Sequence, residues 1–134
     1  MSVKNIQTCF VIDDDIDDLE IFAMALQKVD DSIDLRSASD CTVALKELRE
    51  DVSYVPDFIF LDINMPKMNG LQCLPELKKL PHLKNVKVIM YSTSSNEELK
   101  QTTRQLGADD FLVKPGKLGV LVNHLNRILE KPKL

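Results

Sequence analysis

Short apolar runs alternate along the chain with segments in which apolar residues recur at helical spacing. Most of the runs are continuously apolar, which is typical of parallel strands covered on both faces. The five predicted strands are TCFVI at 8–12, IDLRS at 33–37, FIFL at 58–61, VKVIMY at 86–91 and FLV at 111–113. This pattern predicts a parallel sheet whose strands are separated by helices.

The segments between the strands carry apolar side chains at i, i+3, i+4 and i+7, the spacing that gathers them on one helix face. The clearest sets are Leu19, Phe22, Ala23 and Leu26, then Cys41, Ala44, Leu45 and Leu48, and last Leu118, Leu121, Val122, Leu125, Ile128 and Leu129. Each set predicts a helix that packs one face against the sheet.

Two predicted helices depart from this pattern. Between positions 96 and 106 only Leu99 and Leu106 are strongly apolar. We therefore expect a weakly anchored helix there, which is a candidate for motion. The third helix contains Pro75, which lacks a backbone N–H and crowds the preceding turn. We expect this helix to begin late or to bend.

The alternation of strands and helices predicts an α/β fold, a doubly wound parallel sheet with right-handed crossovers. A length of 134 residues is close to the commonest domain size. We expect a single domain over residues 1–134 with a core at about 8–129, and no output domain.

Composition narrows the classes of partner. The net charge of −4 argues against general nucleic-acid binding, and no apolar run is long enough to span a membrane. We expect a cytoplasmic protein with no DNA or membrane partner. The three cysteines, Cys9, Cys41 and Cys73, fit neither a disulfide framework nor a zinc pattern. We expect each to be buried and reduced.

Polar side chains follow four of the five predicted strands. They are Asp13, Asp14 and Asp15 after the first strand, Asp62 after the third, Ser92, Thr93 and Ser94 after the fourth, and Lys114 after the fifth. The carboxyl ends of parallel strands meet at one sheet edge, where doubly wound proteins bind their ligands. We therefore expect these groups to form one site.

The chemistry of this predicted edge favours a divalent cation. Adjacent carboxylates repel and raise one another's pKa, and a hard cation such as Mg²⁺ removes that penalty. We expect Mg²⁺, with Mn²⁺ as an alternative. A metal, a lysine and a hydroxyl suit the equatorial oxygens of a phosphoryl group in transfer, and a carboxylate can be the nucleophile that accepts it.

Four motifs give the chain a family resemblance. They are the first strand followed by aspartates, then LDINMPKMNG, MYSTSS and GADDFLVKPG. In this order and spacing they resemble the receiver domain of two-component response regulators, specifically the stand-alone kind that includes the chemotaxis regulators. The resemblance covers roughly positions 8–129. It implies a flavodoxin-like (βα)5 fold with strand order 2-1-3-4-5.

The resemblance also implies the acceptor and the metal ligands. Asp62 stands at the phosphoacceptor position. Asp14 would bind Mg²⁺ directly, Asp13 would act mostly through a coordinated water, and the backbone carbonyl of Asn64 would complete the protein ligands beside Asp62. We choose Asp13 and Asp14 because the apolar run stops just before them, and leave Asp15 as a solvated neighbour.

Further roles follow from the same resemblance. Ser92 stands where the family has a switch hydroxyl, at the usual separations from the acceptor and the lysine, and Thr93 competes for that role. Lys114 would bind the phosphate, aimed by a cis bond to Pro115. Phe111 stands at the position of the switch aromatic residue.

The lifetime of the phosphoryl group would depend on two small polar residues, Asn64 and Ser94, that flank the path of water by family analogy. The implied function is a single-domain response regulator that accepts a phosphoryl group from a histidine kinase or phosphotransfer protein. The face made by the fourth helix, fifth strand and fifth helix would then signal to a downstream protein, as a monomer or a phosphorylation-dependent dimer. Beyond assisting its own phosphorylation and dephosphorylation, it would not be an enzyme.

Two alternatives from other classes use the acidic run differently. A haloacid-dehalogenase phosphatase needs a Thr or Val two residues beyond its second Asp, which Asp17 and Asp18 do not supply. A calcium loop of EF-hand type matches at Asp13, Asp15 and Asp17, but Asp18 replaces its Gly and Met24 its final Glu.

A third alternative is a receiver fold used as a phosphorylation-independent binding module. Degenerate members of the family usually lose an acidic residue, the acceptor or the lysine. This chain keeps Asp13, Asp14, Asp62 and Lys114. Their retention favours phosphorylation.

Overall fold

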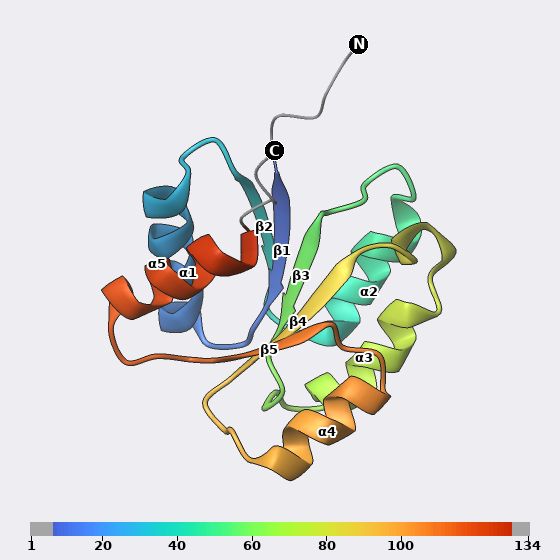
Figure 1. Cartoon of the computed structure of the whole chain (residues 1–134). Helices are drawn as coiled ribbons and strands as arrows, with labels where there is room; N and C mark the ends of the chain where they lie inside the picture. Colours follow the sequence, from blue (N-terminus) through green and yellow to red (C-terminus); the bar gives the residue numbers. More distant parts are fainter. Residues whose placement is uncertain (1–6, 130–134) are drawn as a thin grey trace, which may run out of the picture.

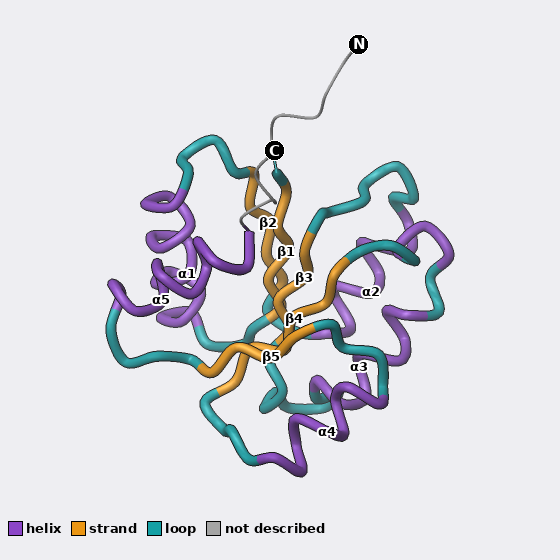
Figure 2. The backbone as a smooth tube through the Cα atoms, viewed as in Figure 1, coloured by secondary structure: helices purple, strands orange, loops and turns teal. Residues whose placement is uncertain are grey.

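The computed structural model describes residues 7–129 and contains a five-stranded parallel sheet in the order β2-β1-β3-β4-β5. Figures 1 and 2 show the twisted sheet at the centre of the molecule. Its strands are β1 (Thr8–Ile12), β2 (Asp34–Ala38), β3 (Phe58–Leu61), β4 (Lys87–Ser92) and β5 (Asp110–Val113). The predicted fold class and strand order are confirmed, and every predicted strand lies within one residue of its observed bounds.

Helices cover both faces of the sheet (Figure 1). On one face lie α1 (Ile16–Val29) and α5 (Leu118–Leu129), and on the other lie α2 (Cys41–Glu50), α3 (Gly70–Lys78) and α4 (Glu97–Gln105), with a short 3-10 turn at Pro81–Leu83. No helix within residues 7–129 has the length and apolar character needed to cross a bilayer.

Each layer has its own hydrophobic core. Under α1 and α5, the ring of Phe22 packs edge-on against Phe60 and Tyr91, with centroids 4.8 and 5.4 Å apart. Under α2 and α3, the core is built around Phe10, Ile12 and their neighbours on β3 and β4. The central strands bury side chains on both faces, which explains why their sequences are apolar throughout.

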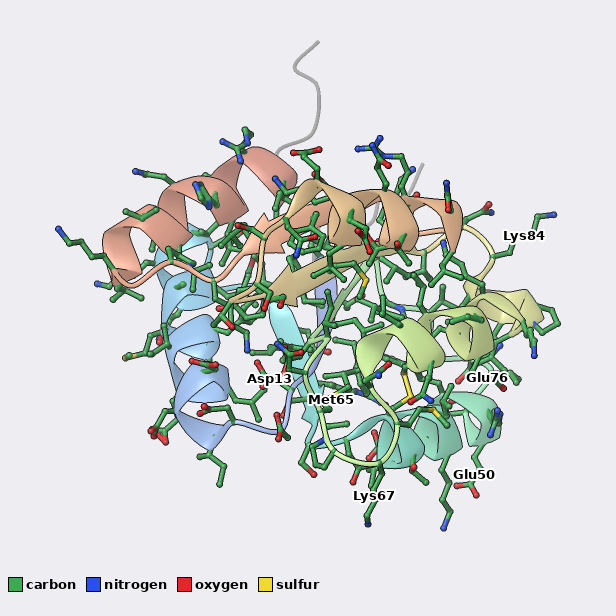
Figure 3. The ribbon with its side chains drawn as sticks, turned by 90° about the horizontal axis from the view of Figure 1, so that it is seen from below. Asp13, Glu50, Met65, Lys67, Glu76 and Lys84 are labelled. Carbon is green, nitrogen blue, oxygen red and sulfur yellow. A yellow bond between two sulfur atoms is a disulfide. The ribbon has the colours of Figure 1, made fainter. Side chains whose placement is uncertain are left out.

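The cysteine prediction was wrong for two of the three residues. Cys41 and Cys73 form a disulfide between α2 and α3, with Cα atoms 6.0 Å apart, whereas Cys9 remains a free thiol. All three are fully buried, as expected. The pairing depends on two helices lying side by side on one sheet face, visible as the yellow bond in Figure 3. Spacing along the chain does not reveal that contact.

Helix α3 does not begin late. Asn69 accepts a hydrogen bond from the N–H of Gln72, and the Gln72 side chain accepts one from the N–H of Asn69. This capping box fixes the start of the helix at Gly70, ahead of Pro75. Pro75 therefore lies inside the helix, and the expected late start is wrong.

Helix α4 is weakly anchored, as predicted. Its one buried residue within the described chain is Thr103, whose hydroxyl donates to the carbonyl of Lys100 at 3.0 Å. Leu99 is half-buried and Leu106 is exposed. The helix begins after Asn96, whose side chain accepts from the N–H of Leu99 at 2.7 Å. Capping therefore supports α4 where apolar burial is small.

The disulfide predicts a redox-dependent stability. Closing a loop over a separation of 32 residues restricts the unfolded chain by about 3 to 4 kcal/mol in the chain-entropy model. We expect a reductant to lower the thermal midpoint of the wild type and to leave a Cys41→Ala/Cys73→Ala variant unchanged. Thiol counting on denatured protein without reductant should find one thiol; finding all three would contradict the pairing.

Candidate functional site

The carboxyl ends of four strands bring the predicted polar residues to one edge. Hydrogen bonds between strands continue one residue past the ends of β3 and β5. The N–H of Asp62 donates to the carbonyl of Ile12 at 2.9 Å, and the N–H of Lys114 donates to the carbonyl of Ser92 at 2.8 Å. In Figure 3 Asp13 lies at this edge near Met65. The backbone therefore fixes where each functional side chain begins.

Three carboxylates meet at this edge. Asp13, Asp14 and Asp62 each offer one oxygen, and these oxygens lie within 4.8 Å of one another. Asp13 and Asp62 are buried, whereas Asp14 is exposed. Oxygen donors at such spacing suit a hard divalent cation such as Mg²⁺. The structure thus brings together the three predicted carboxylate ligands.

A single ammonium group lies among these carboxylates. The Nζ of Lys114 donates to Asp13 at 2.7 Å and to Asp18 at 2.9 Å, and lies 3.4 Å from an oxygen of Asp62. It also lies 5.1 Å from the centroid of the Tyr91 ring. Lys114 is therefore held by a second carboxylate, Asp18, that the sequence analysis did not assign to the site.

Asp15 and Asp18 are linked by a hydrogen bond at the start of α1. Asp15 is the N-cap of α1, and its side chain accepts from the N–H of Asp18 at 3.1 Å. Its own N–H donates to Asp13 at 3.0 Å. Asp15 is exposed, as predicted, and it is also the helix cap. An aspartate followed three residues later by another acid at a helix start was the available signal.

Burial and charge shift the pKa values of the two buried partners. Burial, and then the neighbouring Asp13, raise the pKa of Asp62 to about 6, against the opposing effect of Lys114. Burial acts to lower the pKa of Lys114, but the hydrogen bonds to Asp13 and Asp18 outweigh it and raise that pKa. Near neutral pH Asp62 is therefore ionised and Lys114 is charged.

The hydroxyl candidates differ in their surroundings. Ser92 is fully buried, and its oxygen accepts from the N–H of Ser94 at 3.1 Å. Thr93 is exposed and lines a pocket of about 490 Å³ at the site. Phe111 is half-buried against the core under α3. The pocket is lined by Asp14, Asp15, Asp18, Asp62, Asn64, Thr93 and Lys114.

The predicted cis bond between Lys114 and Pro115 is not present. The described residues contain no cis peptide bond, so this bond is trans. The Lys114 side chain reaches the carboxylates without it, because its backbone N–H is bonded to Ser92 and its ammonium to Asp13 and Asp18.

The loop between β3 and α3 folds back onto the acceptor position. The N–H of Gly70 donates to the carbonyl of Ile63 at 2.9 Å. A Cβ at Gly70 would lie 2.4 Å from the backbone oxygen of Asp62, so only glycine fits this approach. Lys67 has φ of 66°, a left-handed conformation that side chains adopt at some cost in free energy. It projects outward at the loop tip (Figure 3).

We expect Gly70→Ala to disturb the site. The new methyl group would collide with the backbone of Asp62 and Ile63, which is worth about 2 to 4 kcal/mol of stability. Urea unfolding should show that loss, and Mg²⁺ titration should show weaker binding. Gly119→Ala, where a Cβ meets nothing within 4 Å, is the control. Equal stability of the two variants would contradict the close approach.

We expect Asp62→Asn to stabilise the metal-free protein at high pH. The folded-state pKa of about 6 lies above the ordinary 3.8, so folding favours the protonated acid, and that contribution is lost as pH rises through 6. The Asn variant avoids the penalty, which is at most about 3 kcal/mol at about 1.4 kcal/mol per pKa unit. Urea unfolding in EDTA should show its advantage growing from pH 4 to pH 8; an advantage that does not vary with pH would contradict the raised pKa.

Comparison with known proteins places the chain in a family. The model described as response regulator receiver domain matches residues 9–126. The chemotaxis protein CheY of Thermotoga maritima is 27% identical over 113 residues, which cover 84% of this chain and 92% of CheY. A probable cyclic di-GMP phosphodiesterase of Vibrio cholerae is 28% identical over 135 residues, which cover 99% of this chain but only 29% of that protein.

Solved structures of response regulators also resemble this chain. The phosphorylated cyanobacterial phytochrome response regulator RcpA aligns with a TM-score of 0.81 and 28% identity, covering 91% of this chain and 90% of RcpA. The Mn²⁺-bound response regulator Rcp1 aligns with a TM-score of 0.79 and 26% identity, covering 96% of this chain and 98% of Rcp1. The chain therefore belongs to the response regulator receiver domain family.

Proposed function

We propose that this protein is a phosphoryl-accepting response regulator, with Asp62 as the acceptor. The observation that carries the proposal is the convergence of three carboxylates within 4.8 Å around one buried ammonium, whose Nζ lies 3.4 Å from Asp62. The donor would be the phosphohistidine of a histidine kinase or phosphotransfer protein. The phosphorylated state of RcpA, a relative of similar fold, supports this reaction class.

The proposed metal ligands are Asp13, Asp14, Asp62 and the backbone carbonyl of Asn64. The three carboxylate oxygens are close enough to share one ion, and the exposed Asn64 lines the same pocket. A bound Mg²⁺ or Mn²⁺ supplies charge neutralisation for phosphoryl oxygens. The Mn²⁺-bound form of Rcp1 supports a divalent cation in this fold.

In the proposed transfer, an oxygen of Asp62 attacks phosphorus and the bond from phosphorus to the histidine nitrogen breaks. The nitrogen then takes up a proton, and the product is an aspartyl phosphate. The charge of Lys114 lies where the phosphoryl oxygens would gather, so it stabilises them in the transition state. At neutral pH Asp62 is ionised despite its raised pKa, so the nucleophile is ready.

The proposed switch uses Ser92 and Phe111. The Ser92 oxygen already accepts from Ser94, and its O–H is left to donate to a phosphoryl oxygen. Movement at the end of β4 would shift α4, which buries one residue in the described chain, and Phe111, which is half-buried. Thr93 and Ser94 are exposed, Thr93 and Asn64 line the pocket at the site, and we propose that Asn64 and Ser94 influence the approach of water.

The proposed output is a protein–protein contact through the face of α4, β5 and α5. A pocket of about 260 Å³ lies between α4 and β5 on this face, with Lys100, Arg104 and Phe111 in its lining. A downstream protein target of the two-component pathway would bind there. We propose no catalytic action on a separate substrate. The protein would act in the cytoplasm, either as a monomer or as a phosphorylation-dependent dimer.

Acetyl phosphate tests the proposal directly. Incubation with Mg²⁺ should add one phosphoryl group by intact mass, and the adduct should be base-labile and prevented by EDTA or Asp62→Asn. Asp17→Asn, which removes an exposed carboxylate outside the pocket lining, is the matched control and should still be labelled. No adduct on folded wild type, together with no binding of beryllofluoride, would favour the phosphorylation-independent binding module instead.

A further inference from the structure

We infer that Asp18 is a positioning residue that competes with the phosphoryl group for the ammonium of Lys114. This inference rests on the proposed function, because it concerns how the same site binds its phosphoryl group. Asp18 lies outside the group of carboxylates close enough to share a metal. Its role must therefore come from its contact with the lysine.

The hydrogen bonds of Lys114 favour Asp18 over the acceptor. An ammonium group has three donors, and two of them are given to Asp13 at 2.7 Å and Asp18 at 2.9 Å. The nearest oxygen of Asp62 is farther, at 3.4 Å. Because the lysine side chain is 8% exposed, water supplies little compensation when either bond is lost. In the unphosphorylated protein Lys114 is thus held more closely by Asp18 than by the acceptor.

Asp13 would be shared between the lysine and the proposed metal. One of its oxygens accepts from the N–H of Asp15 at 3.0 Å, and the other accepts from Lys114. Any bond from Asp13 to a metal, direct or through water, draws on these same oxygens. Asp18 makes no such contribution, so it remains the carboxylate that competes with phosphoryl oxygens for Lys114.

The position of Asp18 is fixed by α1. Its N–H donates to the capping side chain of Asp15 at 3.1 Å, in the first turn of the helix. Its side chain is 30% exposed and faces the pocket that also contains Asp62. A fixed negative charge at this place also repels an incoming phosphoryl dianion. Competition for the donor and repulsion of the ligand therefore act in the same direction.

Beryllofluoride binding in saturating Mg²⁺ tests the inference. We expect Asp18→Asn to bind it about 5- to 20-fold more tightly than wild type, because the ammonium is no longer drawn towards a second carboxylate and a negative charge beside the site is removed. Phosphorylated Asp18→Asn should also lose its phosphoryl group more slowly. Calorimetry and the amide shifts of Ser92 report the binding, since the chain has no tryptophan.

Two further variants distinguish the effect of the contact between Asp18 and Lys114 from the effect of removing one negative charge. Asp17→Asn removes the same charge from the same helix turn, but Asp17 is exposed and is not a partner of Lys114 in the described chain. It should bind within about twofold of wild type, and 0.5 M salt should abolish even that difference. Asp18→Glu keeps a carboxylate and should return the affinity towards that of wild type.

The outcomes distinguish the two proposals. If wild type binds beryllofluoride and Asp18→Asn binds equally or more weakly, the competition by Asp18 is wrong and the proposed function stands. If wild type neither binds beryllofluoride nor accepts a phosphoryl group, the proposed function itself fails. Thermal unfolding of each free variant shows whether it is folded, and if Asp18→Asn unfolds, Asp18→Ser takes its place with the same expected result.

Discussion

The site depends on the attraction between one buried ammonium and several carboxylates. Without Lys114, the burial of Asp13 and Asp62 side by side would leave like charges in a poorly solvated place. The raised pKa of Asp62 shows that the lysine does not offset the whole penalty. The carboxyl edge of the sheet therefore keeps a net negative charge, beside a pocket with room for a cation. The same imbalance that limits the stability of the metal-free fold would favour the binding of the proposed metal.

Several local features serve to keep these groups in place. The capping side chain of Asp15 fixes the first turn of α1, and its N–H orients Asp13. The absence of a side chain at Gly70 lets the next loop pack directly on the backbone of Asp62. Three consecutive aspartates therefore have three surroundings: Asp13 is buried, Asp14 is an exposed member of the proposed metal ligands, and Asp15 caps a helix.

The sequence predicted the fold well because its signals are local. Buried parallel strands have continuously apolar sequences, and the buried faces of the helices have apolar residues at helical spacing. It failed where the outcome depends on contacts between distant segments. The bond between Cys41 and Cys73 requires α2 and α3 to be neighbours, and the contact of Asp18 with Lys114 joins α1 to the end of β5. At Pro75 the expected late start was wrong, because a capping box formed by Asn69 and Gln72 fixes the start of α3 ahead of the proline.

Those distant contacts also explain how a small chemical event can reach a surface. Lys114 joins the start of α1, through Asp18, to the chain segment after β5, and a hydrogen bond from its backbone joins that segment to Ser92. A phosphoryl group that draws the ammonium away from Asp18 would alter contacts on both sides of the sheet edge. On one side α4 has little apolar burial to resist displacement, whereas α1 is capped and packed through Phe22. A ligand shifts the equilibrium between two arrangements only by the difference between its binding free energies for the two. We therefore propose that the unequal anchoring of α1 and α4 would direct that preference towards α4 and Phe111.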